Sequence, residues 1–125
     1  MRSVIDANIA IYAVLPCAFH DSAIALLEQL VREEVTLYVP RLWLTEVATG
    51  IRKVAVRARI SPESARMALD AAFSLPVEIV SEDVALCYRA YWWAEQLGQM
   101  AVYDALYLAL AEPWRLPSIR LTRPW

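Results

Sequence analysis

The chain has 125 residues, of which 59% are hydrophobic and 21% are charged, and its net charge is −2 at pH 7. This length suffices for a core of its own, so we expect residues 1–125 to form a single domain. The small negative charge does not indicate a nucleic-acid-binding protein, and no uncharged stretch reaches the ~20 residues of a membrane span. Because Asp6 interrupts the beginning of the chain, no secretory signal is predicted, and the expected location is the cytoplasm.

The first half of the chain alternates between short apolar runs and longer segments with helical periodicity. Ala23, Leu27 and Leu30 follow the 3.6-residue period of a helix, and Pro40 ends the second apolar run. The predicted elements are a strand at Arg2–Ile5, a helix at Ala18–Glu34, a strand at Val35–Val39 and a helix at Leu42–Arg57.

Capping residues and prolines mark the elements of the second half. Ser61 is a predicted N-cap with Pro62 at the first helical position, and Gly98 is a predicted C-cap. The predicted elements are a helix from Pro62 to about Phe73, a strand at Val77–Val80, a helix between Ser81–Asp83 and Gly98, a helix at Val102–Glu112 and a short strand at Ser118–Thr122. Strands that alternate with helices predict an α/β fold with a mainly parallel sheet, and such folds bind ligands at the carboxyl ends of their strands.

Three acidic residues lie in apolar surroundings, where a buried carboxylate is costly. Asp6 ends the first strand, Glu46 interrupts an apolar helix, and Asp104 lies in the apolar run at 102–111. An isolated buried carboxylate costs several kcal/mol unless it is paired, neutralised or bound to a cation. For each acid alone, a surface or capping role is an alternative. Together they favour a site for Mg²⁺ or Mn²⁺, which prefer oxygen ligands.

Basic residues and cysteines give weaker signals. Six basic residues lie between Arg41 and Arg66 against two acids, a distribution typical of a solvated helix face and also suited to phosphate contacts. Cys17 and Cys87 have no metal-ligand spacing, so we expect reduced cysteines in the core.

Aromatic residues and the single histidine allow structural interpretations. Trp92 and Trp93 either stack on RNA bases or pack in the core or at a dimer interface, and their helical spacing with Tyr88 and Leu97 favours packing. His20 precedes a helix pattern, and a structural role is favoured over general base catalysis.

Three segments carry a family resemblance. Val4–Asn8 reads VIDAN, Leu44–Val47 reads LTEV, and Tyr103–Ala111 reads YDALYLALA. In this order and at these intervals, they resemble the PIN-domain ribonucleases, and more narrowly the VapC-type toxins of bacterial and archaeal toxin–antitoxin pairs. The third segment is the most specific of the set.

The resemblance implies a fold, an activity and a set of site residues. The implied fold is a three-layer α/β/α domain with a mainly parallel central sheet, and the implied activity is hydrolysis of RNA phosphodiester bonds with Mg²⁺ or Mn²⁺. Asp6, Glu46 and Asp104 match the catalytic acids that hold the metal, while Asn8, Thr45 and Thr122 match polar positions beside them. The implied partners are an RNA substrate, a cognate antitoxin and a second copy of the chain, with no membrane.

One departure from the family pattern opens an alternative. Relatives carry a fourth acid shortly after the last strand, whereas this sequence reads Leu121-Thr122-Arg123-Pro124-Trp125 and has no acid after Glu112. The expectation is therefore a shortened C-terminal end and doubt about a second metal. The alternative is a PIN-fold module that binds RNA or an antitoxin and is catalytically weakened or inactive. A third, weaker hypothesis is that the protein is a DNA nuclease.

Overall fold

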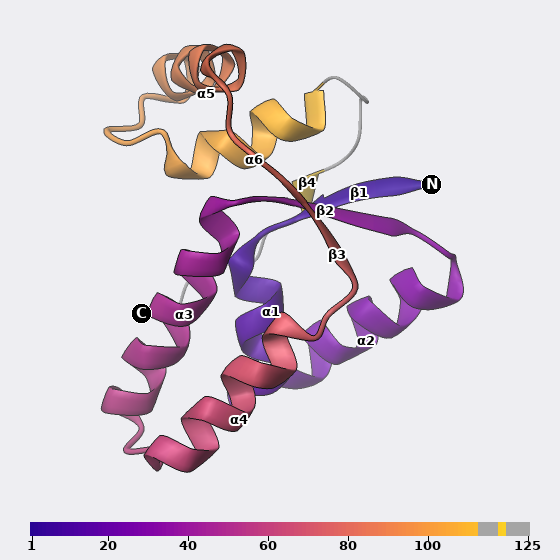
Figure 1. The fold of residues 1–125 in the computed structure, drawn as a ribbon, viewed down its shortest axis with the longest axis vertical. Coiled ribbons are helices and arrows are strands. Elements are labelled where there is room, and N and C mark those ends of the chain that lie inside the picture. The colour runs from indigo at the N-terminus through magenta and orange to yellow at the C-terminus, as the bar shows by residue number, and fades with distance from the viewer. Residues whose placement is uncertain (113–117, 120–125) are drawn as a thin grey trace.

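The computed structural model describes residues 1–112 and the backbone of residues 118–119, and its centre is a parallel sheet (Figure 1). The strands are β1 (Arg2–Ile5), β2 (Thr36–Pro40), β3 (Val77–Val80) and β4 (Ser118–Ile119). Their order is β3-β2-β1-β4, and each neighbouring pair is parallel. Because β2 and β3 follow β1 on one side and β4 pairs with its other side, β1 is the strand where the order reverses. Open α/β sheets place their ligand sites at the carboxyl end of such a strand.

Helices cover both faces of the sheet (Figure 1). One layer contains α1 (Ala7–Val14), α2 (His20–Arg32), α3 (Leu42–Arg57) and α4 (Pro62–Phe73), and the other contains α5 (Val84–Leu97) and α6 (Tyr103–Ala111). The second layer meets the sheet through α6, which contacts β1 and β2, while α5 packs on α6. This arrangement confirms the expected three-layer α/β/α fold. No helix among the described residues is long and apolar enough to cross a lipid bilayer.

The most deeply buried segment runs from β1 into α1. Val4, Ile5 and Ile9 have no exposed surface. Trp43 from α3 and Tyr107 from α6 are each 1% exposed, so the two helix layers contribute large side chains to the core. Burial of apolar surface stabilises by ~25 cal/mol per Å², so these side chains help to hold α3 and α6 against the sheet.

Most of the predicted elements are confirmed. The helices at 42–57 and 62–73 and the strands at 2–5 and 77–80 have the predicted bounds, and Ser61 accepts a hydrogen bond from the Ser64 N–H at 3.1 Å. Gly98 ends α5 with φ +66°, a conformation that favours glycine. Helix α2 is shorter than predicted, β2 includes Pro40, and α1 was not predicted. Residues 120–122 of the predicted last strand lie outside the described residues.

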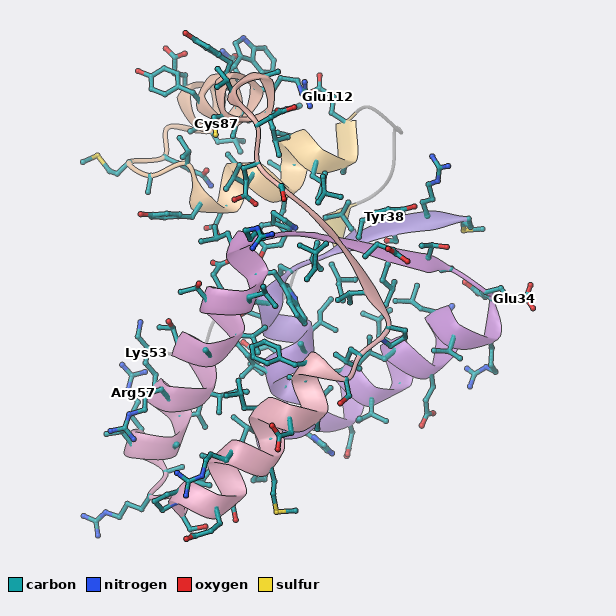
Figure 2. The ribbon with its side chains drawn as sticks, viewed as in Figure 1. Glu34, Tyr38, Lys53, Arg57, Cys87 and Glu112 are labelled. Carbon is teal, nitrogen blue, oxygen red and sulfur yellow. The ribbon has the colours of Figure 1, made fainter. Side chains whose placement is uncertain are left out.

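One sequence interpretation is wrong and another is confirmed in part. Cys17 and Cys87 are free thiols, but both are exposed rather than in the core: Cys17 lies in the α1–α2 connection and Cys87 on α5 (Figure 2). The packing interpretation holds for Trp93, which is partly buried and donates from Nε1 to Glu112 Oε2 at 3.1 Å. Trp92 is 50% exposed and therefore outside the core, although its ring lies edge-on to Trp93 at a centroid distance of 5.0 Å, and its place at a dimer interface stays a prediction.

Candidate active site

A cavity of about 280 Å³ lies between α1, α3 and the beginning of α6. Residues Ala7 and Ile11 of α1 and Leu42 of α3 give it apolar walls. Its polar lining consists of Asn8 from α1, Thr45, Glu46, Thr49 and Lys53 from α3, and Tyr103 from α6. Three predicted site residues, Asn8, Thr45 and Glu46, therefore share one cavity.

Asp6 lies directly after β1, where the chain passes into α1. It is the N-cap of that helix, and its Oδ1 accepts a hydrogen bond from the Ile9 N–H at 3.4 Å. The side chain is 6% exposed, and Asn8, two residues further on, is 5% exposed and lines the cavity. Capping provides a donor for the carboxylate and a fixed position at the helix N-terminus, where negative charge is stabilised.

Glu46 connects α3 with α6. The half-buried carboxylate lines the cavity, and its Oε1 accepts a hydrogen bond from the Tyr107 hydroxyl at 2.5 Å. Tyr107 is itself 1% exposed, so its ring position is set by packing. The hydroxyl therefore orients one oxygen of Glu46 from a rigid neighbouring helix. Thr45, the preceding residue, is exposed at the same cavity.

Asp104 lies in the first turn of α6 and is half-buried. Its neighbour Tyr103 lines the cavity, but the lining formed by the described residues includes neither Asp104 nor Asp6. Each of these two acids is next in sequence to a lining residue, Asp6 to Ala7 and Asp104 to Tyr103. Thr122 lies outside the described residues.

The oxygen donors at this site suit a hard divalent cation. Carboxylate, amide and hydroxyl oxygens are the ligands that Mg²⁺ and Mn²⁺ prefer. Within the described part of the chain, no group of three or more His, Cys, Asp or Glu side chains is arranged to hold a metal ion. His20 is engaged elsewhere, with Nδ1 2.9 Å from the Tyr12 carbonyl oxygen, which supports its structural role. The donor chemistry fits Mg²⁺ or Mn²⁺, and water ligands would have to complete the coordination.

The cavity also includes residues that were not predicted as site residues. Lys53 and Tyr103 line the cavity, and Tyr107 donates to the lining residue Glu46, but none of the three was predicted as a site residue. A signal existed for Lys53, because it follows Glu46 by two turns and therefore lies on the same side of α3. The bond between Tyr107 and Glu46 has no comparable signal, because the two residues are 61 positions apart.

Comparison with known proteins identifies the family. A sequence profile of the PIN domain family matches residues 3–119. The chain belongs to the PIN domain family. The ribonuclease VapC9 of Mycobacterium tuberculosis and a VapC ribonuclease of Mycobacterium bovis are each 34% identical to this PIN domain over 109 residues, which span 87% of this chain and 76% of the relative. The resemblance to PIN-domain proteins of VapC type is confirmed.

Two solved structures share the fold of this PIN domain. VapBC2 from Rickettsia felis, bound to a DNA fragment from its promoter, matches with a TM-score of 0.64 and 23% identity, covering 94% of this chain and 86% of that chain. VapC20 from Mycobacterium tuberculosis, a Sarcin-Ricin loop cleaving toxin, matches with a TM-score of 0.65 and 16% identity, covering 91% and 84%. At these identities the likeness supports the α/β/α architecture alone.

Proposed function

We propose that this PIN domain is a metal-dependent endoribonuclease, the toxin of a type II toxin–antitoxin pair, and that it hydrolyses RNA phosphodiester bonds. The observation that carries the proposal is the cavity at the α1 N-terminus, which Glu46, Asn8 and Thr45 line together, and Asp6 and Asp104 are next in sequence to two of its lining residues. The 34% identity to VapC ribonucleases over 87% of the chain supports the same activity.

The catalytic groups in this proposal are Asp6, Glu46 and Asp104, which hold Mg²⁺ or Mn²⁺ with the help of water. A bound cation of this kind polarises a phosphoryl oxygen and activates water for attack. Asp6 contributes a carboxylate fixed by its cap on α1, and Tyr107 holds Glu46 in one orientation through the 2.5 Å hydrogen bond. Asn8 supplies an amide at the cavity wall that can orient a ligand or water.

The proposal includes partners. A cognate antitoxin would bind this chain and block its cavity, and a second copy would complete a homodimer. The Rickettsia felis neighbour, a VapBC2 structure with promoter DNA, supports the search for a protein partner of the antitoxin kind. Size-exclusion chromatography with light scattering tests the homodimer directly.

An RNA cleavage assay tests the activity. Wild-type protein is incubated with a labelled RNA pool in Mn²⁺, Mg²⁺ or EDTA, with single-stranded DNA as the comparison substrate. Glu46→Gln and Asp104→Asn are expected to lower the cleavage rate by at least about 100-fold, because loss of even an outer-sphere contact to a metal costs 10–100-fold. Glu95→Gln, an exposed acid on α5, is the matched control and keeps the wild-type rate.

The alternative is a binding module with weak or no catalysis, and one observation favours it. The described residues provide no group of three acids arranged for an ion. This alternative predicts that RNA binds and remains intact in both cations. Cleavage by wild-type protein that disappears in EDTA and in Asp104→Asn contradicts the alternative, whereas intact RNA under all conditions contradicts the enzyme.

A further inference from the structure

The mouth of the active-site cavity has a cation on one helix and an aromatic ring on another. Lys53 extends from α3 and Tyr103 lies at the beginning of α6, and both line the cavity that contains Glu46. Both side chains are exposed, and Tyr103 retains 58% of its surface. The proposed hydrolysis uses neither residue.

The position of Lys53 follows from the helical repeat of α3. Glu46, Gly50, Lys53 and Arg57 are spaced by four, three and four positions, so they lie along one side of the helix. Two turns separate Lys53 from Glu46, about 10.5 Å along the axis at ~1.5 Å per residue. Figure 2 shows Lys53 and Arg57 on the same outer side of α3. A row of positive charge therefore leads away from the acidic end of the cavity.

The chemistry of Lys53 differs from that of the other basic residues. It is the one lysine among twelve basic residues, and the other eleven are arginines. A lysine ammonium is a compact charge on a flexible stem with three donors, which suits a backbone phosphate whose position varies from one substrate to another. The exposed tyrosine ring at the same cavity offers a flat surface on which a base can stack.

We propose that Lys53 and Tyr103 form a subsite for one unpaired nucleotide next to the cleaved bond. Lys53 binds the phosphate of that nucleotide, and the ring of Tyr103 stacks on its base. Because the faces of bases in a duplex are covered by their neighbours, the subsite selects RNA that is single-stranded or unpaired at that position. This inference rests on the proposed endoribonuclease function and adds the residues that position its substrate.

The chain offers a matched control on the same helix. Arg52 is exposed like its neighbour Lys53, but it lines a different cavity, between α3 and α4, together with Pro62 and Arg66. Substituting either residue with glutamine removes one positive charge from α3. Only Lys53→Gln removes that charge from the active-site cavity, so a difference between the two variants reports position rather than net charge.

Binding experiments with two probes separate the two contacts. The probes are a fluorescein-labelled ten-nucleotide RNA of mixed sequence and an abasic oligoribonucleotide of the same length, both measured by anisotropy in EDTA. Lys53→Gln is expected to weaken binding of both probes and to lower the slope of log K against log salt by about 0.7, the value for one phosphate contact on a single strand. Tyr103→Ala is expected to weaken binding of the mixed-sequence RNA by about 5-fold or more, the equivalent of a lost stacking contact of ~1 kcal/mol.

The conservative variant Tyr103→Phe and the abasic probe test whether the effect of Tyr103 comes from its ring stacking on a base. Tyr103→Phe retains the ring and is expected to bind the mixed-sequence RNA like wild-type protein, and Tyr103→Ala is expected to bind the abasic probe like wild-type protein. In Mn²⁺ cleavage assays, Lys53→Gln and Tyr103→Ala raise KM more than they lower kcat, because they change substrate binding rather than the reacting groups.

The outcomes distinguish this inference from the proposed function. If wild-type protein cleaves RNA while Lys53→Gln matches Arg52→Gln in salt slope and KM, the phosphate contact is overturned. If Tyr103→Ala weakens binding of the mixed-sequence RNA and of the abasic probe equally, the stacking contact is overturned. A wild-type protein that neither binds RNA in EDTA nor cleaves it in Mn²⁺ contradicts the proposed function, and the subsite with it.

Discussion

Helices α1 and α5 are both rich in hydrophobic residues, yet they differ widely in burial. In α1, every residue from Ala7 to Ala13 is buried, and the helix packs against α2, α3 and α4. In α5, the buried residues are Leu86, Ala90 and Ala94, and the main packing partner is α6. The buried helix is therefore the one with three neighbouring helices and no charged residue, and the exposed helix is the one that packs mainly on a single neighbour.

This difference bears on the active site. The acid Asp6 caps α1, so the position of its carboxylate is fixed by the most tightly packed helix of the domain. Tyr88, Tyr91 and Trp92 on α5 are 75%, 60% and 50% exposed, respectively. Asp6 is thus held by the buried helix α1, whereas α5 with its exposed aromatic residues belongs to the other helix layer (Figure 1).

The largest expected effect comes from truncating the buried helix. Ile9→Ala removes a side chain with no exposed surface, and we expect the free energy of unfolding to fall by about 2–5 kcal/mol because of lost burial and the cavity that remains. Val84→Ala on α5 is the control, since this side chain is 73% exposed and its loss should change stability by less than about 0.5 kcal/mol. Urea denaturation measures both. Equal losses in the two variants would contradict the contrast between α1 and α5.

A smaller effect is expected where the interior meets the site. Tyr107→Phe removes the hydroxyl that donates to Glu46, and we expect a loss of about 1.5 kcal/mol, the lower end for hydrogen bonds to charged groups, because Glu46 is only half-buried. The cleavage rate should fall with it, because Glu46 loses its fixed orientation. Tyr103→Phe removes a hydroxyl from an exposed ring at the same cavity and serves as the control for denaturation. If Tyr107→Phe retains wild-type stability and rate, the hydrogen bond does not orient Glu46.

The smallest effect is expected for chemical modification of the two exposed cysteines. Cys87 on α5 and Cys17 before α2 are both exposed, so a thiol reagent should label both in the native protein without denaturant. Labelling by a small reagent is expected to change the free energy of unfolding by less than about 0.5 kcal/mol, as surface substitutions do. Mass spectrometry counts the modified thiols. A thiol that reacts only after unfolding would place that cysteine in the core, as the sequence interpretation held.

Much of the fold was predictable because capping residues and prolines mark the ends of its helices in the sequence. Ser61 and Pro62 open α4, Gly98 ends α5, and the bounds of α3 follow its helical period. Helix α1 was missed because Ala7–Val14 is apolar except for Asn8, so it lacks the regular polar positions that reveal a helical period. The exposure of the two cysteines was missed because the residues around each of them in the sequence do not indicate whether the thiol faces solvent or the core.

The candidate site was predictable to a lesser extent. Asn8, Thr45 and Glu46 share the cavity as their motifs indicate, and the positions of Asp6 and Asp104 follow from the ends of β1 and the beginning of α6. Tyr107 could not be connected to Glu46 from sequence, because its hydroxyl reaches that acid only through packing between separate layers. The roles of the three acids as metal ligands stay a prediction.

The most direct test of the account is thermal melting with and without Mn²⁺, because its central claim is that Asp6, Glu46 and Asp104 act together on a divalent cation. The comparison variant is Asp6→Asn/Asp104→Asn, in which asparagine keeps the N-cap of α1 while the negative charge is removed. A cation that binds only the folded state stabilises it by about 2.7 kcal/mol at a hundredfold excess over Kd. The account predicts a Mn²⁺-dependent rise in the Tm of wild-type protein that is lost in the variant. No rise in wild-type protein at millimolar Mn²⁺, or an equal rise in both proteins, would contradict it.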